Sequence, residues 1–231
     1  MIKAIAWDID GTLVDSEPLH LFALKQVCLA HEVDISDLDD THFVGVHIGN
    51  VWKELQPRFP AGLSFAAWSE KINRAFADNA RRLVEIAGAR AVVAGFAEKG
   101  LRQVAVSNSN RAVVDANLAA IGVAEFMEFS LSLDDVCEGK PDPFPYRLAC
   151  YLLRLDPSEV LAVEDSATGA ASARAAGLPV AFLHAKDRAE GQTPIASLAE
   201  LTGVIAEQAG ATGIDRDAHE ELQGPQRLRH A

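Results

Sequence analysis

The sequence predicts an α/β protein whose core is a doubly wound, Rossmann-like parallel sheet with an all-helical cap inserted after its first strand. From Gly88 onward, apolar runs of strand length alternate with helical segments, which is typical of a parallel sheet with right-handed crossovers. Another apolar run, at residues 2–7, opens the chain, and the stretch between these two parts shows only helical spacing. We therefore expect a core of residues 1–14 and 88–231 and a cap of residues 15–87.

Composition supports a packed globule and excludes several classes of protein. The chain has 231 residues, enough for one large core and a smaller domain, and 49% of them are hydrophobic. A net charge of −12 argues against a general nucleic-acid or membrane-surface binder, although a local cationic site can still take an anionic substrate. No apolar run approaches the ~20 residues that span a bilayer.

The cysteines and the first residues suggest a compartment. The three cysteines show no metal-type spacing, and one would be left over from any disulfide, which favours a reducing environment. Acidic residues interrupt the first apolar run too early for a signal peptide. We expect a cytoplasmic protein that binds neither nucleic acid nor a membrane. A monomer is favoured, although composition leaves the oligomeric state open.

The first strand-length run leads into Asp8-Ile9-Asp10-Gly11-Thr12. Two acids separated by one residue can converge on one small site, where their like charges favour a bound cation or a shared proton. An acidic turn is the alternative for an isolated pair of this kind.

The cap is expected to contain three helices. The first begins with Ser16 as its cap and Pro18 in its first turn and continues to Ala30. The second covers about residues 49–59. The third begins at Ser64 and has one apolar stripe, formed by Phe65, Trp68, Ile72, Phe76 and Leu83.

The second part of the chain gives the remaining core elements. Helices are expected over about residues 88–100, 113–121, 144–155 and 168–176, and strands over 103–106, 129–133, 160–163 and 179–183. Two prolines keep the loop at residues 138–143 out of any helix. The last ~20 residues are polar and without a clear period, which predicts a loose tail.

Four polar clusters follow expected core strands, at the edge where open α/β sheets bind ligands. Each has an ordinary explanation as a helix cap, a solvated lysine or an acidic turn, but their occurrence together in this order indicates one site. The clusters are Asp8 with Asp10, Ser107 with Asn108, Lys140, and Glu164 with Asp165.

These motifs resemble those of the haloacid dehalogenase (HAD) superfamily. The chain is similar to the capped subgroup of β-phosphoglucomutase and many small sugar-phosphate and phosphoglycolate phosphatases. The likeness extends to about Leu183 and rests on the Asp8–Thr12 motif, Ser107, Gly139-Lys140-Pro141 and Glu164-Asp165-Ser166, with Gly169 and Gly177.

The resemblance implies a Mg²⁺-dependent phosphatase of a small phosphorylated metabolite. Asp8 would be the nucleophile that forms an aspartyl-phosphate, and Asp10 the general acid and then the base. Mg²⁺ would be held by Asp8, the Asp10 carbonyl and Asp165, with Glu164 near or in its shell. Phosphoryl oxygens would be bound by Ser107 and Lys140, with Asn108 supporting that loop.

Two other functions are kept as alternatives. A β-phosphoglucomutase-like mutase would need a second phosphate site, but the cap turn Gly45-Val46-His47-Ile48-Gly49 lacks the arginine of mutase-like caps. His47 could replace that arginine, and His20 lies where some relatives position the acid/base with a histidine; exposure to solvent is the alternative for each. A regulatory phospho-acceptor domain would need neither Asp10 nor the helical insert.

Overall fold

The computed structural model describes residues 1–184 and 191–206, so the expected loose tail lies outside the described residues. Its centre is a six-stranded sheet in which every neighbouring pair is parallel. The strand order is β5 (Phe129–Leu131), β4 (Arg102–Val106), β1 (Ala4–Trp7), β6 (Val160–Glu164), β7 (Val180–Leu183) and β8 (Gln192–Ile195).

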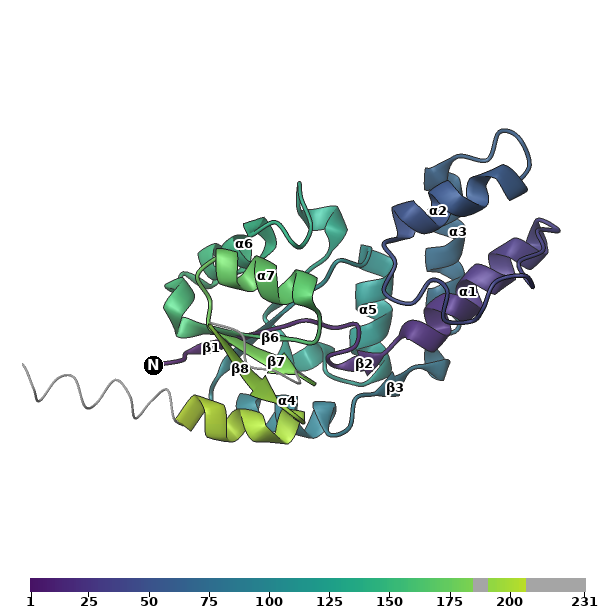
Figure 1. Cartoon of the computed structure of the whole chain (residues 1–231). Helices are drawn as coiled ribbons and strands as arrows, with labels where there is room; N and C mark the ends of the chain where they lie inside the picture. Colours follow the sequence, from purple (N-terminus) through teal and green to yellow (C-terminus); the bar gives the residue numbers. More distant parts are fainter. Residues whose placement is uncertain (185–190, 207–231) are drawn as a thin grey trace, which may run out of the picture.

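Helices cover both faces of this sheet (Figure 1). Strand β1 shows why, because Ile5 and Trp7 face one apolar cluster while Ala4 and Ala6 face another. The first cluster takes side chains from α4 (Ala89–Glu98) and α5 (Arg111–Ala120), and the second from α6 (Phe144–Leu153) and α7 (Ala167–Ala175). The doubly wound fold is thus confirmed.

Three helices lie between β1 and α4 in the chain and form the cap, set to one side of the sheet (Figure 1). They are α1 (Glu17–Ala30), α2 (Ile48–Leu55) and α3 (Phe65–Asp78), with short 3-10 turns at Gln56–Arg58 and Ala80–Arg82. The cap has its own apolar core, in which the Trp52 and Trp68 rings lie 5.0 Å apart. The helical insert is therefore confirmed.

The base of the insert differs from the prediction. Val14–Asp15 (β2) and Val84–Glu85 (β3) form a two-stranded antiparallel ribbon, so the segment 15–87 is not helical throughout. Two-residue strands are too short to show alternation, which is why the sequence pattern missed them. The domain boundaries at residues 15 and 87 stay a prediction.

Other element ends also shift. The second cap helix ends at Leu55 rather than Phe59, because Pro57 lies in the 3-10 turn that follows. The third ends at Asp78, before Leu83. Strand β8 was not predicted, since Pro194 lies inside it; an edge strand tolerates proline. The remaining 3-10 turns are Ala124–Phe126, Leu133–Asp135, Pro157–Glu159 and Leu198–Glu200.

Cap and core also touch away from the ribbon. Val113 of α5 packs into the apolar core of the cap, and Asn73 Nδ2 of α3 donates to Asn110 Oδ1 over 3.0 Å. Within residues 1–184 and 191–206, no helix is long and apolar enough to cross a membrane.

Candidate active site

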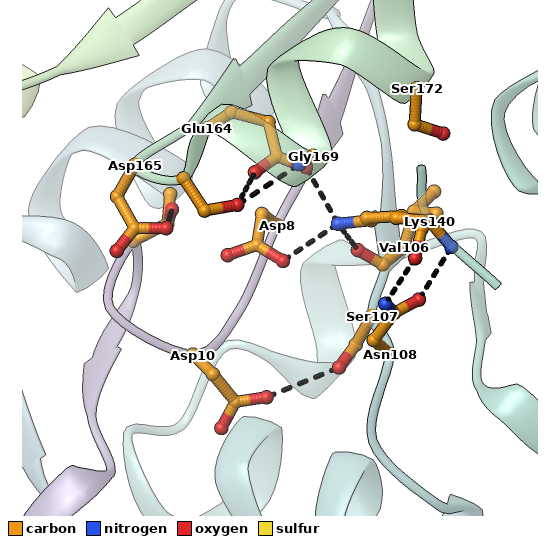
Figure 2. A network of polar contacts seen from close by, with 12 residues as sticks. Asp8, Asp10, Val106, Ser107, Asn108, Lys140, Glu164, Asp165, Gly169 and Ser172 are labelled. Carbon is orange, nitrogen blue, oxygen red and sulfur yellow. Dashed lines mark hydrogen bonds and ion pairs between the residues drawn. The ribbon is translucent and has the colours of Figure 1, made fainter. Parts of the chain in front are cut away.

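The carboxyl ends of three neighbouring strands bring the predicted site residues together (Figure 2). Asp8 follows β1, Ser107 follows β4, and Glu164 is the last residue of β6. Lys140 joins them from the loop before α6, in which its peptide bond to Pro141 is cis. All four residues are buried. Asp8 and Lys140, which lie 132 positions apart in the chain, are thus in direct contact.

Lys140 connects this cluster electrostatically. Its Nζ donates to Asp8 Oδ1 over 2.7 Å, to Glu164 Oε1 over 2.6 Å and to the Val106 carbonyl over 2.7 Å (Figure 2). Burial alone would lower the pKa of Lys140, but the two carboxylates raise it above its ordinary value. Because an ammonium has three hydrogens, a phosphoryl oxygen could bind Lys140 only by replacing one of these partners.

Asn108 holds the loop that carries Lys140. Its Nδ2 donates to the Lys140 carbonyl over 2.9 Å, and its Oδ1 accepts the Lys140 backbone N–H over 2.8 Å. Gly139 is required beside it, because a Cβ there would lie 2.8 Å from Asn108 Oδ1. Both ends of the Asn108 amide are therefore hydrogen-bonded to the backbone of Lys140. The predicted role of Asn108 is to support the loop that carries Lys140.

Asp8, Glu164 and Asp165 offer carboxylate oxygens that all lie within 4.8 Å of one another. Burial raises the pKa of Asp8 to about 7, although the charge of Lys140 lowers it. Burial and then the charge of Asp8 raise the pKa of Asp165 to about 6. Close-set carboxylates with raised pKa values are the donor set that a hard divalent cation would neutralise, so the residues fit such a metal.

Glycines make room for two of these acids. A Cβ at Gly11 would lie 2.1 Å from Asp165 Oδ2, and the φ of Gly11 is +84°. A Cβ at Gly169 would lie 2.0 Å from Glu164 Oε2. Both glycines belong to the sequence motifs. Glycine is needed at these two positions because the backbone lies so close to a carboxylate that a Cβ would not fit.

Asp10 is surrounded by hydrogen-bond donors. Its Oδ2 accepts from Ser107 Oγ (3.2 Å) and Ser109 Oγ (2.9 Å), and its Oδ1 from Ser16 Oγ (2.6 Å) and Asn117 Nδ2 (3.0 Å). Burial alone would raise the pKa of this carboxyl, but hydrogen bonds and nearby His20 hold it well below its ordinary value. Asp10 is therefore ionised in this arrangement.

Sequence reasoning missed the contacts of three of these donors. Ser16 was expected to cap α1, but its hydroxyl makes no cap hydrogen bond and donates to Asp10 instead. Ser109 lies in the polar loop after β4 and was not singled out. Asn117 occupies a position on the apolar stripe of α5, between Val114 and Leu118, so a polar residue on a buried helical face was the available signal.

Tyr146 is a further residue that sequence reasoning missed. It lies fully buried on α6, and its hydroxyl donates to Glu164 Oε1 over 2.5 Å. The same oxygen accepts from Lys140, and the Lys140 Nζ lies 5.2 Å from the centre of the Tyr146 ring. An isolated tyrosine six residues after the lysine carries no sequence signal for this contact, because it depends on how α6 packs on the sheet.

The two cap histidines that the sequence analysis named, His20 and His47, differ in position. His20 on α1 reaches the site, since its Nε2 lies 3.5 Å from Asp10 Oδ1 and its ring centre lies 4.5 Å from that of Phe76. His47 is the exposed N-cap of α2, and its Nδ1 accepts from the Gly49 backbone N–H over 3.1 Å. Within the described residues His47 makes no contact with Asp8 or Asp10, so a substrate role for it stays a prediction.

Comparison with known proteins decides the family. The sequence pattern of the haloacid dehalogenase-like hydrolases matches residues 2–177, which include every predicted core site residue. The chain belongs to the haloacid dehalogenase-like hydrolases.

Its relatives within this family include named phosphatases. The chain is 32% identical over 195 residues to a plasmid-encoded phosphoglycolate phosphatase of Cupriavidus necator, covering 78% of this chain and 80% of that protein. It is 33% identical over 192 residues to the protein CbbY of Rhodobacter capsulatus, covering 78% and 84%.

Solved structures give the same result for the fold. Crystal structures of CbbY from Rhodobacter sphaeroides superpose on this HAD-like hydrolase across 87% of its chain and 96% of theirs. The structure in complex with phosphate has a TM-score of 0.78 and 27% sequence identity. The structure of a variant in complex with xylulose-(1,5)bisphosphate has a TM-score of 0.77 and 26% sequence identity. Family and relatives together support a phosphoric monoester hydrolase.

Proposed function

We propose that this HAD-like hydrolase is a Mg²⁺-dependent phosphatase that acts on a small phosphorylated metabolite through an aspartyl-phosphate on Asp8. The observation that carries the proposal is the buried position of Asp8 between the Lys140 ammonium and the acidic pair Glu164–Asp165. A carboxylate with a cation on one side and an oxygen-rich metal site on the other suits attack on a phosphoryl group, whose charge needs neutralising on several oxygens.

The first step transfers the phosphoryl group to the protein. An Asp8 oxygen forms a bond to phosphorus, the bond from phosphorus to the ester oxygen breaks, and Asp10 gives a proton to the departing alcohol. Mg²⁺, held by Asp8, Asp165 and the Asp10 carbonyl with Glu164 nearby, would neutralise charge on the phosphoryl oxygens. Ser107 and Lys140 would also bind those oxygens, Lys140 by exchanging one of its present hydrogen-bond partners for a phosphoryl oxygen.

The second step returns the protein to its starting state. A water oxygen forms a bond to phosphorus and gives a proton to Asp10, and the bond from phosphorus to Asp8 breaks, which releases inorganic phosphate. Asp10 thus ends the cycle carrying the proton that the next substrate needs. Without substrate, Ser16 at the base of the cap and His20 of the cap favour the ionised Asp10. Substrate must therefore react with the form of the protein in which Asp10 carries a proton.

Phosphate release tests this proposal. Wild-type protein with Mg²⁺ should release phosphate continuously from p-nitrophenyl phosphate and from small sugar phosphates, and chelation of the metal should stop it. Asp8→Asn should abolish release while leaving the circular dichroism spectrum unchanged. Stable stoichiometric phosphorylation without turnover would instead identify a phospho-acceptor domain, and interconversion of sugar-phosphate isomers would identify a mutase.

A further inference from the structure

Asn117 is an unexpected neighbour for Asp10. It lies on the core helix α5, is fully buried, and donates from Nδ2 to Asp10 Oδ1 over 3.0 Å across 107 positions in the chain. The residues around it on the same face, Val114 and Leu118, pack on the sheet as ordinary apolar side chains. An amide at this position is therefore not required for packing.

The carbonyl oxygen of the Asn117 amide lacks a hydrogen-bond partner among the described residues. This oxygen, Oδ1, is nevertheless buried. A buried polar atom without a partner costs about 1–3 kcal/mol, so a leucine of similar size would suit the fold better. A site that keeps a locally unfavourable residue is a candidate for function.

The two oxygens of Asp10 have different kinds of partner. Oδ2 accepts from the hydroxyls of Ser107 and Ser109, and a hydroxyl can turn to accept a hydrogen bond as readily as it donates one. An amide NH₂ only donates, and in a protonated carboxyl the carbonyl oxygen accepts a hydrogen bond better than the hydroxyl oxygen. As long as Asn117 holds this orientation, a proton on Asp10 is favoured on Oδ2, on the side of Ser107 and Ser109.

The source of each donor matters as well. Ser16 and His20 also reach Oδ1, but they belong to the cap and its base, whereas Asn117 comes from the core. A donor on the core stays beside Asp10 when the cap moves. It can therefore fix the carboxylate throughout the catalytic cycle.

We propose that Asn117 is a positioning residue for proton transfer: it fixes Asp10 Oδ1 from the core side and keeps the transferable proton on Oδ2. This inference rests on the proposed phosphatase function, because it assigns Asp10 as the acid and base. The geometry of a positioned acid is sensitive, and a misplacement of about 1 Å can cost roughly 100-fold in rate.

A double-mutant cycle with Asp10 gives the test. In single-turnover phosphorylation of Asp8 by an alkyl phosphate, Asn117→Leu should be roughly 10- to 100-fold slower than wild type, with KM and Mg²⁺ affinity nearly unchanged. In an Asp10→Asn background the same substitution should cost less than about threefold, because its effect passes through Asp10. The loss should also shrink for p-nitrophenyl phosphate, whose leaving oxygen needs little protonation.

Controls separate positioning from stability. Leu118→Ala, next to Asn117 in the same helix, should lower stability without changing the dependence of rate on the leaving group. If Asn117→Leu does not fold, Asn117→Ser removes the contact with a smaller side chain and serves in its place. Equal losses from the Asn117 substitution with and without Asp10, or full activity of the variant, would overturn the inference. A wild-type protein that releases no phosphate would instead refute the proposed function itself.

Discussion

The hydroxyl of Ser16 donates to the carboxylate of Asp10 over 2.6 Å, although Ser16 stands at the N-cap of α1. It joins the base of the cap to the proposed acid and base of the core. Ser64 stands at the N-cap of α3, a helix of the same length, and there the hydroxyl does cap by accepting the Ala67 N–H. Two serines at the same helix position thus have different roles.

This difference predicts opposite phenotypes for two alanine variants. Ser16→Ala should slow turnover of an alkyl phosphate by roughly tenfold, equivalent to about 1.4 kcal/mol, because Asp10 loses a charge-assisted hydrogen bond. Ser64→Ala should leave kcat unchanged and lower the unfolding free energy by about 1 kcal/mol, as loss of a helix cap does. Steady-state kinetics and urea denaturation of both variants give the comparison. Wild-type kcat in Ser16→Ala would show that the contact has no catalytic importance.

A second prediction concerns Tyr146. Tyr146→Phe removes a buried hydrogen bond to Glu164 and should lower the unfolding free energy by about 1.5–3 kcal/mol, the range for bonds to charged groups. Tyr151→Phe is the matched control, because Tyr151 lies on the same helix and is 77% exposed. Urea denaturation of the two variants should show a loss in the first and no change in the second. Equal unfolding free energies of the two variants would mean that the Tyr146 hydroxyl contributes nothing to stability.

The raised pKa values of the acidic cluster predict how Mg²⁺ stabilises the protein. Burial raises the pKa of Asp8 to about 7 and that of Asp165 to about 6, from an ordinary value of 3.8. Between about pH 4 and 7 the folded, metal-free protein therefore binds more protons than the unfolded chain, and these two groups lower its stability as pH rises. Above about pH 5 Asp10 adds little slope, because its pKa is lowered in the folded protein and it is then ionised in both states.

The proposed Mg²⁺ would bind the ionised carboxylates, so its addition should recover this loss of stability. The Mg²⁺-induced gain in unfolding free energy should be larger at about pH 8 than at about pH 5. Urea denaturation with and without Mg²⁺ at the two pH values measures it, and Asp165→Asn should reduce the gain at both. A Mg²⁺-induced gain in unfolding free energy that is larger at about pH 5 than at about pH 8 would contradict the assignment of these carboxylates as metal ligands.

The cysteines allow a simple check of burial. Cys137 is exposed, whereas Cys28 and Cys150 are buried and burial raises the pKa of each to about 11. The native protein should therefore react rapidly with one equivalent of a thiol reagent and with three after unfolding. Rapid loss of a second thiol in the native state would show that one of the buried pair opens easily.

The sequence predicted what depends on local pattern and failed where distant packing decides. Helices α4 to α7 and the buried strands β1, β4 and β6 follow from apolar periodicity and terminal glycines. Because parallel strands end at one edge, the meeting of Asp8, Ser107 and Glu164 was also predictable. The ribbon β2–β3 was not, because each strand has two residues.

Side-chain partners were the least predictable part of the site. Ser16 has the sequence context of a helix cap, and only the position of Asp10 explains why its hydroxyl turns away. Asn117 contacts Asp10 across 107 positions in the chain, a contact that no local pattern contains. His47 is the N-cap residue of α2, which its place in the cap turn did not predict, and its possible substrate role stays a prediction.

Chemical trapping of the intermediate tests the central claim most directly. Wild-type protein mixed with Mg²⁺ and substrate, acid-quenched during turnover and digested, should yield a peptide phosphorylated on Asp8, formed and consumed at rates compatible with kcat. Asp8→Asn should yield none, and Asp10→Asn should accumulate the phosphopeptide when the second step is slowed more than the first. Turnover by the wild type with no phosphoryl group on Asp8 at any quench time, or with the group on another residue, would contradict the proposed mechanism.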